Sequence, residues 1–430
     1  MVPYMEFDIA VVRGLQVIDS RGDPTIEAYV LTEGGGVGRA IAPSGASRGK
    51  LESIDLRDGG KAYKGKGVMR ALEAIEKYIA PAITGMDSSN YRSVDKKLIE
   101  IDGTPNKSKL GGNTCTAVSL AVINAAADTA GVPTFEFLGG KRARTLPTPL
   151  MNIINGGVHA GNKLSIQEFM IAPVGASTFS EALRIGIEVY KELRNILKNL
   201  FGPSAVNVGD EGGYAPPMTR SEQALNAIVR AIKEAGYEPG TDVFLALDAA
   251  ATQFFNPGTG KYVIDGASMS PEDLLDYYVA IANQYPVKSF EDPFHEEQIA
   301  LFKELRRALK GKALVVGDDL TVTRLSLIRR AVKEGAVDGS IIKINQVGTF
   351  SEAEDSIRFL ISNGGKAIIS HRSGDSEDVT ISHIAVAYEV GLIKCGAPSR
   401  GERTSKYNEL LRIEDILGGE GVFAGKNSFS

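Results

Sequence analysis

The chain lacks several features that mark specialised classes of protein. It has only two cysteines, Cys115 and Cys395, in 430 residues, which excludes a disulfide scaffold. Basic residues are not in excess, since 48 Lys and Arg stand against 53 Asp and Glu, which argues against nucleic-acid binding through bulk charge. There is no run of about 18 apolar residues and no signal-peptide pattern at the start. We therefore expect a cytoplasmic protein with no membrane span.

What is present is typical of a globular protein with a sizeable core. The chain is 43% hydrophobic and 23% charged, and its length suggests two domains or a barrel with an extra domain. Residues 1–140 begin with β-branched runs broken by Gly-rich turns. Helical spacing follows over 68–83, and an Ala-rich helix is closed by Gly131 and Pro133. Strands followed by helices predict a small α+β domain over 1–140.

The pattern changes in residues 146–430, where short apolar runs alternate with amphipathic helices. This alternation implies parallel strands joined by helical crossovers. The segment is long enough for a closed (β/α)8 barrel, which typically needs about 250 residues. A doubly wound open sheet is the competing architecture, but the glycine fingerprint expected after its first strand is absent. We therefore predict an α/β barrel over 146–430.

Six apolar runs in this segment each end in an ionisable residue: Asp248, Glu291, Asp318, Lys343, His371 and Lys394. After the second, these residues recur about every 25 positions, close to the roughly 31 residues per unit of a 250-residue barrel. The longer first step needs an insertion, and residues 256–266 (NPGTGKYVIDG) predict a hairpin that supplies it. One acidic residue after a strand is usually a helix N-cap, but Lys and His are poor N-caps. Because barrel strands point their C-terminal ends at the active site, all six should face one pocket.

The chemistry of these six groups indicates a metal and an anionic substrate. The three carboxylates are hard oxygen ligands suited to Mg²⁺, and no zinc-type spacing of cysteine or histidine occurs. The two lysines, with His371 and Arg372, add positive charge that would hold phosphate or carboxylate groups. We expect Mg²⁺ and the second lysine to lower the pKa of one lysine, so that its neutral form could act as a general base.

Three upstream motifs hold further candidates, each with a structural alternative. His159 stands in the Gly-rich turn NGGVHAGN, which suits either ligand binding or turn chemistry. Gln167 and Glu168 lie in an apolar stretch, where a carboxylate is more often paired structurally than catalytic. Glu211 precedes two glycines in VGDEGGYAP, which is either a turn at the pocket mouth or a solvated loop.

Motifs spread along the whole chain resemble those of a known protein family. In order from about residue 8 to the C-terminus, the chain is similar to the enolase family in IDSRGDPTIE, APSGASRG, NKSKLGGN, INGGVHAGN, QEFMIAP, GDEGGYAP, EDPF, DDLTVT, KINQVGT, SHRSGDSED and GAPSRGER. The resemblance implies an N-terminal α+β domain capping a modified TIM-type barrel whose strands are not all parallel. It also implies Mg²⁺-dependent, reversible dehydration of 2-phosphoglycerate to phosphoenolpyruvate in glycolysis and gluconeogenesis, through an ene-diolate, in a homodimer or octamer.

The resemblance further implies a role for each candidate residue. Lys343 would be the base, and Glu211 the acid with Glu168 beside it, in a catalytic group that includes His159. Two Mg²⁺ ions would be held, the first by Asp248, Glu291 and Asp318, and the second by Ser47 when its loop closes over substrate. The substrate-binding residues would be Gln167, Arg372, Ser373, His371 and Lys394.

Two other functions stay open at this stage. A related enzyme, such as an acid-sugar dehydratase or racemase, would use the same kind of base and metal. It is disfavoured by Arg372 and Ser373, which suit phosphate, and by Glu211, which suits the specific acid. A non-enzymatic structural or surface-binding protein could keep the same fold. It is disfavoured because every proposed catalytic residue is present.

Overall fold

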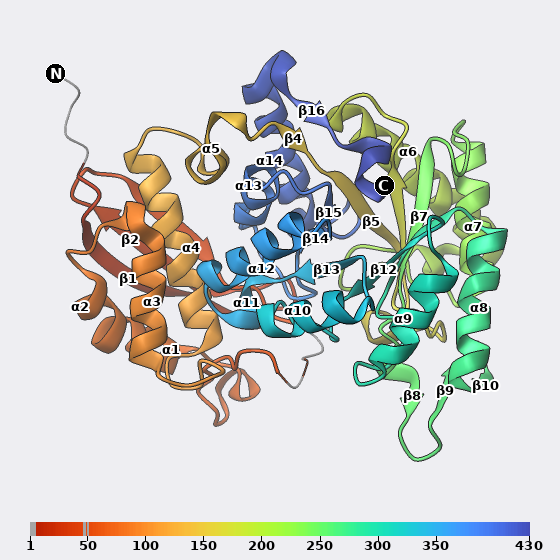
Figure 1. Cartoon of the computed structure of the whole chain (residues 1–430), viewed down its shortest axis with the longest axis horizontal. Coiled ribbons are helices and arrows are strands. Elements are labelled where there is room, and N and C mark those ends of the chain that lie inside the picture. The colour runs from red at the N-terminus through yellow and green to blue at the C-terminus, as the bar shows by residue number, and fades with distance from the viewer. Residues whose placement is uncertain (1–5, 46–48, 50) are drawn as a thin grey trace.

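The computed structural model describes residues 6–45, 49 and 51–430, and it shows two domains side by side (Figure 1). The first domain contains an antiparallel sheet in the order β1 (Ile9–Ile18), β2 (Pro24–Thr32) and β3 (Val37–Ile41). Its helices are α1 (Met69–Ala74), α2 (Ala80–Ile83), α3 (Tyr91–Asp102), α4 (Gly112–Thr129) and α5 (Thr134–Gly139). The predicted α+β domain is therefore present, with the helix expected over 68–83 divided between α1 and α2 by a π-helical turn.

Helix α4 packs directly on this sheet and is almost wholly buried. Gly38 of β3 permits the close approach, because a Cβ there would lie 2.0 Å from the carbonyl oxygen of Ala121. In the described part of the chain, no single helix is long and apolar enough to span a membrane. Helix α4 and the segment Thr134–Arg142 meet that test only as a pair bent by 92°.

The second domain is a closed barrel of eight strands, as predicted, and the open-sheet alternative is excluded. The strands in spatial order are β5 (Thr148–Asn155), β6 (Glu168–Pro173), β7 (Val243–Asp248), β11 (Val287–Glu291), β12 (Leu314–Gly317), β13 (Gly339–Ile342), β14 (Lys366–Ser370) and β15 (Leu392–Lys394). Strand β6 runs antiparallel to both of its neighbours, whereas the other pairs are parallel. The resemblance implied a barrel whose strands are not all parallel, and the structure confirms this.

Helices surround the barrel on its outside (Figure 1). They are α6 (Phe179–Phe201), α7 (Ser221–Glu234), α8 (Pro271–Gln284), α9 (Ile299–Ala308), α10 (Leu325–Glu334), α11 (Ile344–Val347), α12 (Phe350–Ser362), α13 (Thr380–Ala387) and α14 (Gly401–Leu417). The hairpin expected at 256–266 is present within a small sheet of β8 (Phe255–Asn256), β9 (Lys261–Ile264) and β10 (Ala267–Met269). A last short pair joins β4 (Thr145–Leu146) to β16 (Val422–Phe423).

Apolar side chains fill the barrel below its C-terminal end. A separate buried cluster contains alternate residues of the strands, such as Met170 and Ala172 of β6 and Phe244 and Ala246 of β7. The residues between them, such as Ile171 and Leu245, belong to the core shared with the helices. The lumen is therefore a packed core, and polar groups can gather only at its two ends.

Candidate active site

The strand-end groups meet at the C-terminal end of the barrel. Five of the six line one small cavity of about 30 Å³, namely Asp248, Asp318, Lys343, His371 and Lys394. The sixth, Glu291, lies against Lys394 with 2.7 Å between its Oε2 and the lysine Nζ. The upstream candidates His159, Gln167, Glu168 and Glu211 line the same cavity, as do Arg372 and Ser373. Ser47 lies outside the described residues.

One half of the site consists of three carboxylates around a buried lysine. The strand register sets Asp248 opposite both Glu168 and Glu291, so the three lie in one layer of the barrel. Lys394 Nζ reaches all of them, at 3.2 Å from Glu168 Oε2 and 3.5 Å from Asp248 Oδ2 in addition to Glu291. Burial lowers the pKa of Lys394, but these carboxylates outweigh it and hold the pKa well above its usual value.

This layer also contains an unsatisfied ligand atom. Glu291 Oε1 is buried and has no hydrogen-bond partner among the residues the structure describes. Burial raises the pKa of Glu291, and Asp248 raises it further. A buried carboxylate oxygen without a donor is unfavourable by itself, and a divalent cation would satisfy it. The donor set therefore fits a hard metal ion.

On the neighbouring strands, Lys343 contacts Asp318 directly. Gln346 Nε2 donates to the other carboxylate oxygen, Oδ1, at 3.0 Å. Asp292 holds the turn that carries Asp318, because its carboxylate accepts hydrogen bonds from the backbone N–H groups of Asp318 at 2.9 Å and Asp319 at 2.6 Å. The ligand atoms of these three aspartates lie within 4.8 Å of one another, which makes them a second acidic group able to hold a metal.

The protein groups around Lys343 shift its pKa in both directions, and the lowering by Mg²⁺ that we expected stays a prediction. Burial lowers this pKa, and the positive charges of Arg372 and Lys394 lower it further. The adjacent Asp318 carboxylate outweighs burial and raises the pKa above its ordinary value. Spacing along the sequence did not show that Asp318 would contact Lys343, and an opposite charge in contact favours the protonated lysine.

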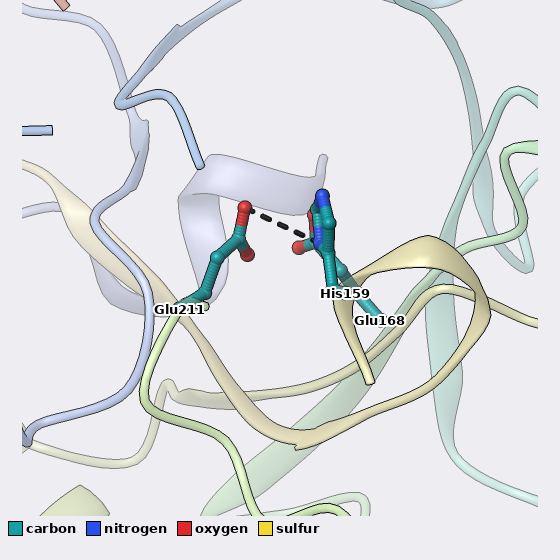
Figure 2. A group of neighbouring side chains, drawn as sticks. All are labelled: His159, Glu168 and Glu211. Carbon is teal, nitrogen blue, oxygen red and sulfur yellow. Dashed lines mark ion pairs between the residues drawn. The ribbon is translucent and has the colours of Figure 1, made fainter. Parts of the chain in front are cut away.

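Glu211 lines the same cavity and lies next to His159 and Glu168 (Figure 2). Its Oε1 lies 3.5 Å from His159 Nδ1, and its Oε2 accepts a hydrogen bond of 3.0 Å from Asn152 Nδ2. The turn after Glu211 requires glycine, because Gly212 has φ +84° and a Cβ there would lie 2.9 Å from a carbonyl oxygen. The turn thus presents Glu211 to the pocket, and the solvated-loop alternative is excluded because Glu211 is buried.

The two glutamates have pKa values shifted in opposite directions. Burial raises the pKa of Glu168 well above its usual value, and the nearby Glu211 adds to the rise. Burial alone would raise the pKa of Glu211 too, but His159 and then His371 offset it and hold the pKa well below its usual range. Adjacent buried carboxyls of this kind titrate as a pair. The surroundings therefore push the pKa values of the two carboxyls apart, which favours a proton on Glu168 over one on Glu211.

Arg403 of α14 positions much of this half of the site, and the sequence analysis missed it. It is fully buried, and its Nη1 donates to His371 Nδ1 and to the carbonyl oxygen of Arg372, both at 2.6 Å. Its Nη2 donates to the carbonyl oxygens of Asp210 at 3.0 Å and Ser373 at 2.7 Å. Because arginine only donates, His371 Nδ1 must accept. Burial lowers the pKa of His371 to about 4, so the neutral ring carries its proton on Nε2, which lies 3.6 Å from Glu211 Oε2.

Arg372 is joined to the N-terminal domain by a second contact that the sequence analysis missed. Its guanidinium donates to Glu52 Oε2 at 3.1 and 3.2 Å and to Asn345 Oδ1 at 2.8 Å. Glu52 is buried and lies five positions after Ser47 in the sequence. The only signals for these partners were their places in the motifs APSGASRGKLE and KINQ, which do not show what each residue contacts.

Comparisons with known proteins agree with this geometry. Residues 9–138 match the model of the enolase N-terminal domain, and residues 143–430 match that of the enolase C-terminal TIM barrel domain. A protein of Aeropyrum pernix named enolase is 52% identical over 420 residues, covering 98% of this chain and 97% of the relative. The enolase of Methanocaldococcus jannaschii is 49% identical over 421 residues, covering 98% of each chain. The chain belongs to the enolase family, a family of lyases.

Proposed function

We propose that the chain catalyses the Mg²⁺-dependent, reversible dehydration of 2-phosphoglycerate to phosphoenolpyruvate through an ene-diolate, as a step of glycolysis and gluconeogenesis. One observation carries the proposal. A lysine, Lys343, and two adjacent carboxyl groups with pKa values shifted in opposite directions, Glu168 and Glu211, line the same buried cavity. A proton removal at one carbon and the protonation of a leaving hydroxyl at the next need such a base and acid in one site.

Each of these residues has its own role in the proposed proton transfers. Lys343 removes the proton on the carbon next to the substrate carboxylate, and the electron pair moves into that carboxylate. Glu211 then delivers a proton to the hydroxyl of the neighbouring carbon, which leaves as water. Glu168, whose pKa is raised by burial, would hold the proton that passes to Glu211. His159 belongs to this catalytic group because its Nδ1 faces Glu211.

The substrate's negative charges are met by residues already in place. We assign the phosphate to Arg372 and Ser373, and the carboxylate end to Lys394. Gln167 and His371 complete the binding wall, with Gln167 Nε2 held 3.4 Å from Asp248 Oδ2. Because these groups are buried and bonded before substrate arrives, they need little reorganisation during the reaction.

The same geometry supports an assignment of the metal ligands. Asp248, Glu291 and Asp318 would hold the first Mg²⁺, and the unsatisfied Glu291 Oε1 supports that choice. Ser47, outside the described residues, would reach the second. When bound, Mg²⁺ supplies positive charge that stabilises the ene-diolate and offsets the carboxylate charge that otherwise keeps Lys343 protonated.

We also propose that the chain forms a homodimer or octamer in the cytoplasm. The exposed face of the N-terminal sheet supports self-association, because Val11, Leu15 and Leu31 are all exposed there. Light scattering from the purified protein would give its mass directly. A monomer at micromolar concentration would contradict this part of the proposal.

The test of the activity is the rise in ultraviolet absorbance when 2-phosphoglycerate is converted to a product with a new C=C bond. We expect Lys343→Ala to lower turnover by about 10²- to 10⁴-fold, the range for a general base, and EDTA to abolish it. Lys333→Ala, at an exposed position at the end of α10, is the matched control and should leave turnover unchanged. Turnover of an unphosphorylated hydroxy acid, with none of 2-phosphoglycerate, would favour the acid-sugar alternative instead.

A further inference from the structure

A cavity of about 740 Å³ opens at the opposite end of the barrel from the candidate active site. Three of its walls are the beginnings of barrel strands, at Phe244 in β7, Lys288 in β11 and Leu314 in β12. The C-terminal turn forms another wall and is tied to the start of β5 by a 3.2 Å hydrogen bond from Thr148 Oγ1 to the carbonyl oxygen of Gly425. We call this space the basal cavity.

The basal cavity is strongly basic. Seven lysine and arginine side chains line it, against one acidic side chain, that of Asp338. Helix α9 contributes Lys303, Arg306 and Arg307, and the loop after it adds Lys310 and Lys312. The chain as a whole carries a net charge of −5, so this concentration of positive charge does not follow from the composition.

Most of this charge is not neutralised within the fold. Among the residues described, no ion pair or side-chain hydrogen bond is made by Lys303, Arg307, Lys310 or Lys426. The other three are engaged: Arg306 with Asp338 at 2.7 Å, Lys312 with Asn283 at 2.6 Å, and Lys288 over the ring of Phe244. Like charges that face one cavity repel each other, so binding an anion there is favourable.

The floor of the cavity is apolar. Phe244 and Leu314 belong to the cluster that fills the barrel lumen, and Phe429 packs against it from the C-terminal turn. The rings of Phe244 and Phe429 meet edge to face with 5.5 Å between their centroids. Phe429 is half-buried and offers part of its surface to the cavity. An apolar floor, a polar rim and this volume are typical of a site for a small molecule.

We propose that the basal cavity binds a phosphorylated small molecule of the nucleoside di- or triphosphate class. Its phosphates would lie on the cationic rim beside Arg307 and Lys310, and its flat base against the floor at Phe429. Several adjacent cations suit a chain of phosphates better than a single carboxylate. The cations converge on one concave site and do not form an extended stripe, which disfavours a nucleic-acid polymer as the ligand.

Isothermal titration of the Mg²⁺-loaded protein with ATP tests the proposal, in the presence of saturating 2-phosphoglycerate so that the active site is blocked. Tripolyphosphate and adenosine are the matched fragments of the ligand. We expect ATP to bind more tightly than tripolyphosphate, and adenosine more weakly than either. The double variant Arg307→Gln, Lys310→Gln should weaken ATP binding by about tenfold or more, because each lost charged contact is worth roughly a factor of ten.

The control variant is Lys191→Gln, Arg194→Gln, an equally spaced and exposed pair on α6. It should bind ATP as the unmodified protein does, and both variants should keep their turnover of 2-phosphoglycerate. No ATP binding at 0.1 M salt, or equal weakening in both variants, would overturn the proposal. Tripolyphosphate binding as tightly as ATP would overturn the role of the apolar floor. Tighter binding of a single-stranded RNA than of ATP would show that the site is a nucleic-acid surface.

Discussion

Charged residues cluster at both ends of the barrel, but they are buried and paired at one end and mostly exposed at the other. At the C-terminal end, Lys394 is buried and bonded to three carboxylates, and Arg403 is fully buried and bonded to His371 and to the carbonyl oxygen of Arg372. At the other end, Arg307 and Lys310 are exposed and have no partner in the described part of the chain. Buried charges must be paired, and the pairing fixes their geometry. Exposed charges need no partner, so they keep no fixed geometry and respond to salt.

Removing one buried charge should have the largest effect on stability and turnover. We expect Lys394→Met to lower the free energy of unfolding at pH 7 by about 3 to 5 kcal/mol and to abolish turnover, because three buried carboxylates lose their common partner. Urea denaturation measures the first effect. Lys288→Met, at the opposite end of the same barrel, is the matched control and should change stability by less than about 1 kcal/mol. Equal losses in the two variants would contradict the comparison.

The same variant has a pH dependence with a defined sign. The pKa values of Glu168 and Glu291 are already raised in the folded protein, and losing Lys394 raises them further. A carboxyl whose folded pKa is raised stabilises the fold below its unfolded pKa and loses that contribution as pH rises through the folded value. The stability deficit should therefore be smallest near pH 4 and grow towards neutral pH. A deficit that grows on acidification would show that Lys394 does not pair with these carboxylates.

A conservative change at Arg403 should have a smaller, more selective effect. Arg403→Lys keeps the charge but loses the fork that holds His371 Nδ1 and the backbone at Arg372. We expect kcat to fall by about 10- to 100-fold and the acidic limb of the pH–rate profile to shift, because the tautomer of His371 is no longer imposed beside Glu211. Arg412→Lys, exposed on the same helix, should leave both unchanged. A loss of stability with an unmoved pH profile would mean that Arg403 is only structural.

Ionic strength should affect ligand binding at one end of the barrel more than catalysis at the other. This is the smallest of the expected effects. Raising the ionic strength from about 0.01 to 0.15 M shortens the screening length from roughly 30 to 8 Å. We expect ATP affinity at the basal cavity to fall by about tenfold, while kcat at the buried site changes by less than about twofold. Titration and rate measurements in matched buffers give both numbers. In Arg307→Gln, Lys310→Gln the salt dependence of ATP binding should flatten, and an unchanged slope would place the ligand elsewhere.

The sequence predicted the barrel and much of the candidate site for one physical reason. Strands of a closed barrel end at a common face, so ionisable residues repeated at strand ends, from Asp248 to Lys394, meet without any contact being known in advance. Glycines after Glu211 likewise signalled a tight turn that presents the carboxylate. Such features depend on periodicity and local backbone geometry, which the order of residues along the chain expresses directly.

Contacts between distant segments could not be read in this way. Glu52 meets Arg372 across two domains, and Arg403 reaches His371 from the last long helix. The Asp318 carboxylate touches Lys343 and raises its pKa, and the sequence did not show this contact. The basal cavity exists only because α9, three strand beginnings and the C-terminal turn converge. The amino-acid sequence alone determined which strands form and which charges stand at their ends. The tertiary structure decided which charges touch, because burial and charge pairing depend on distances in space that the spacing along the chain does not contain.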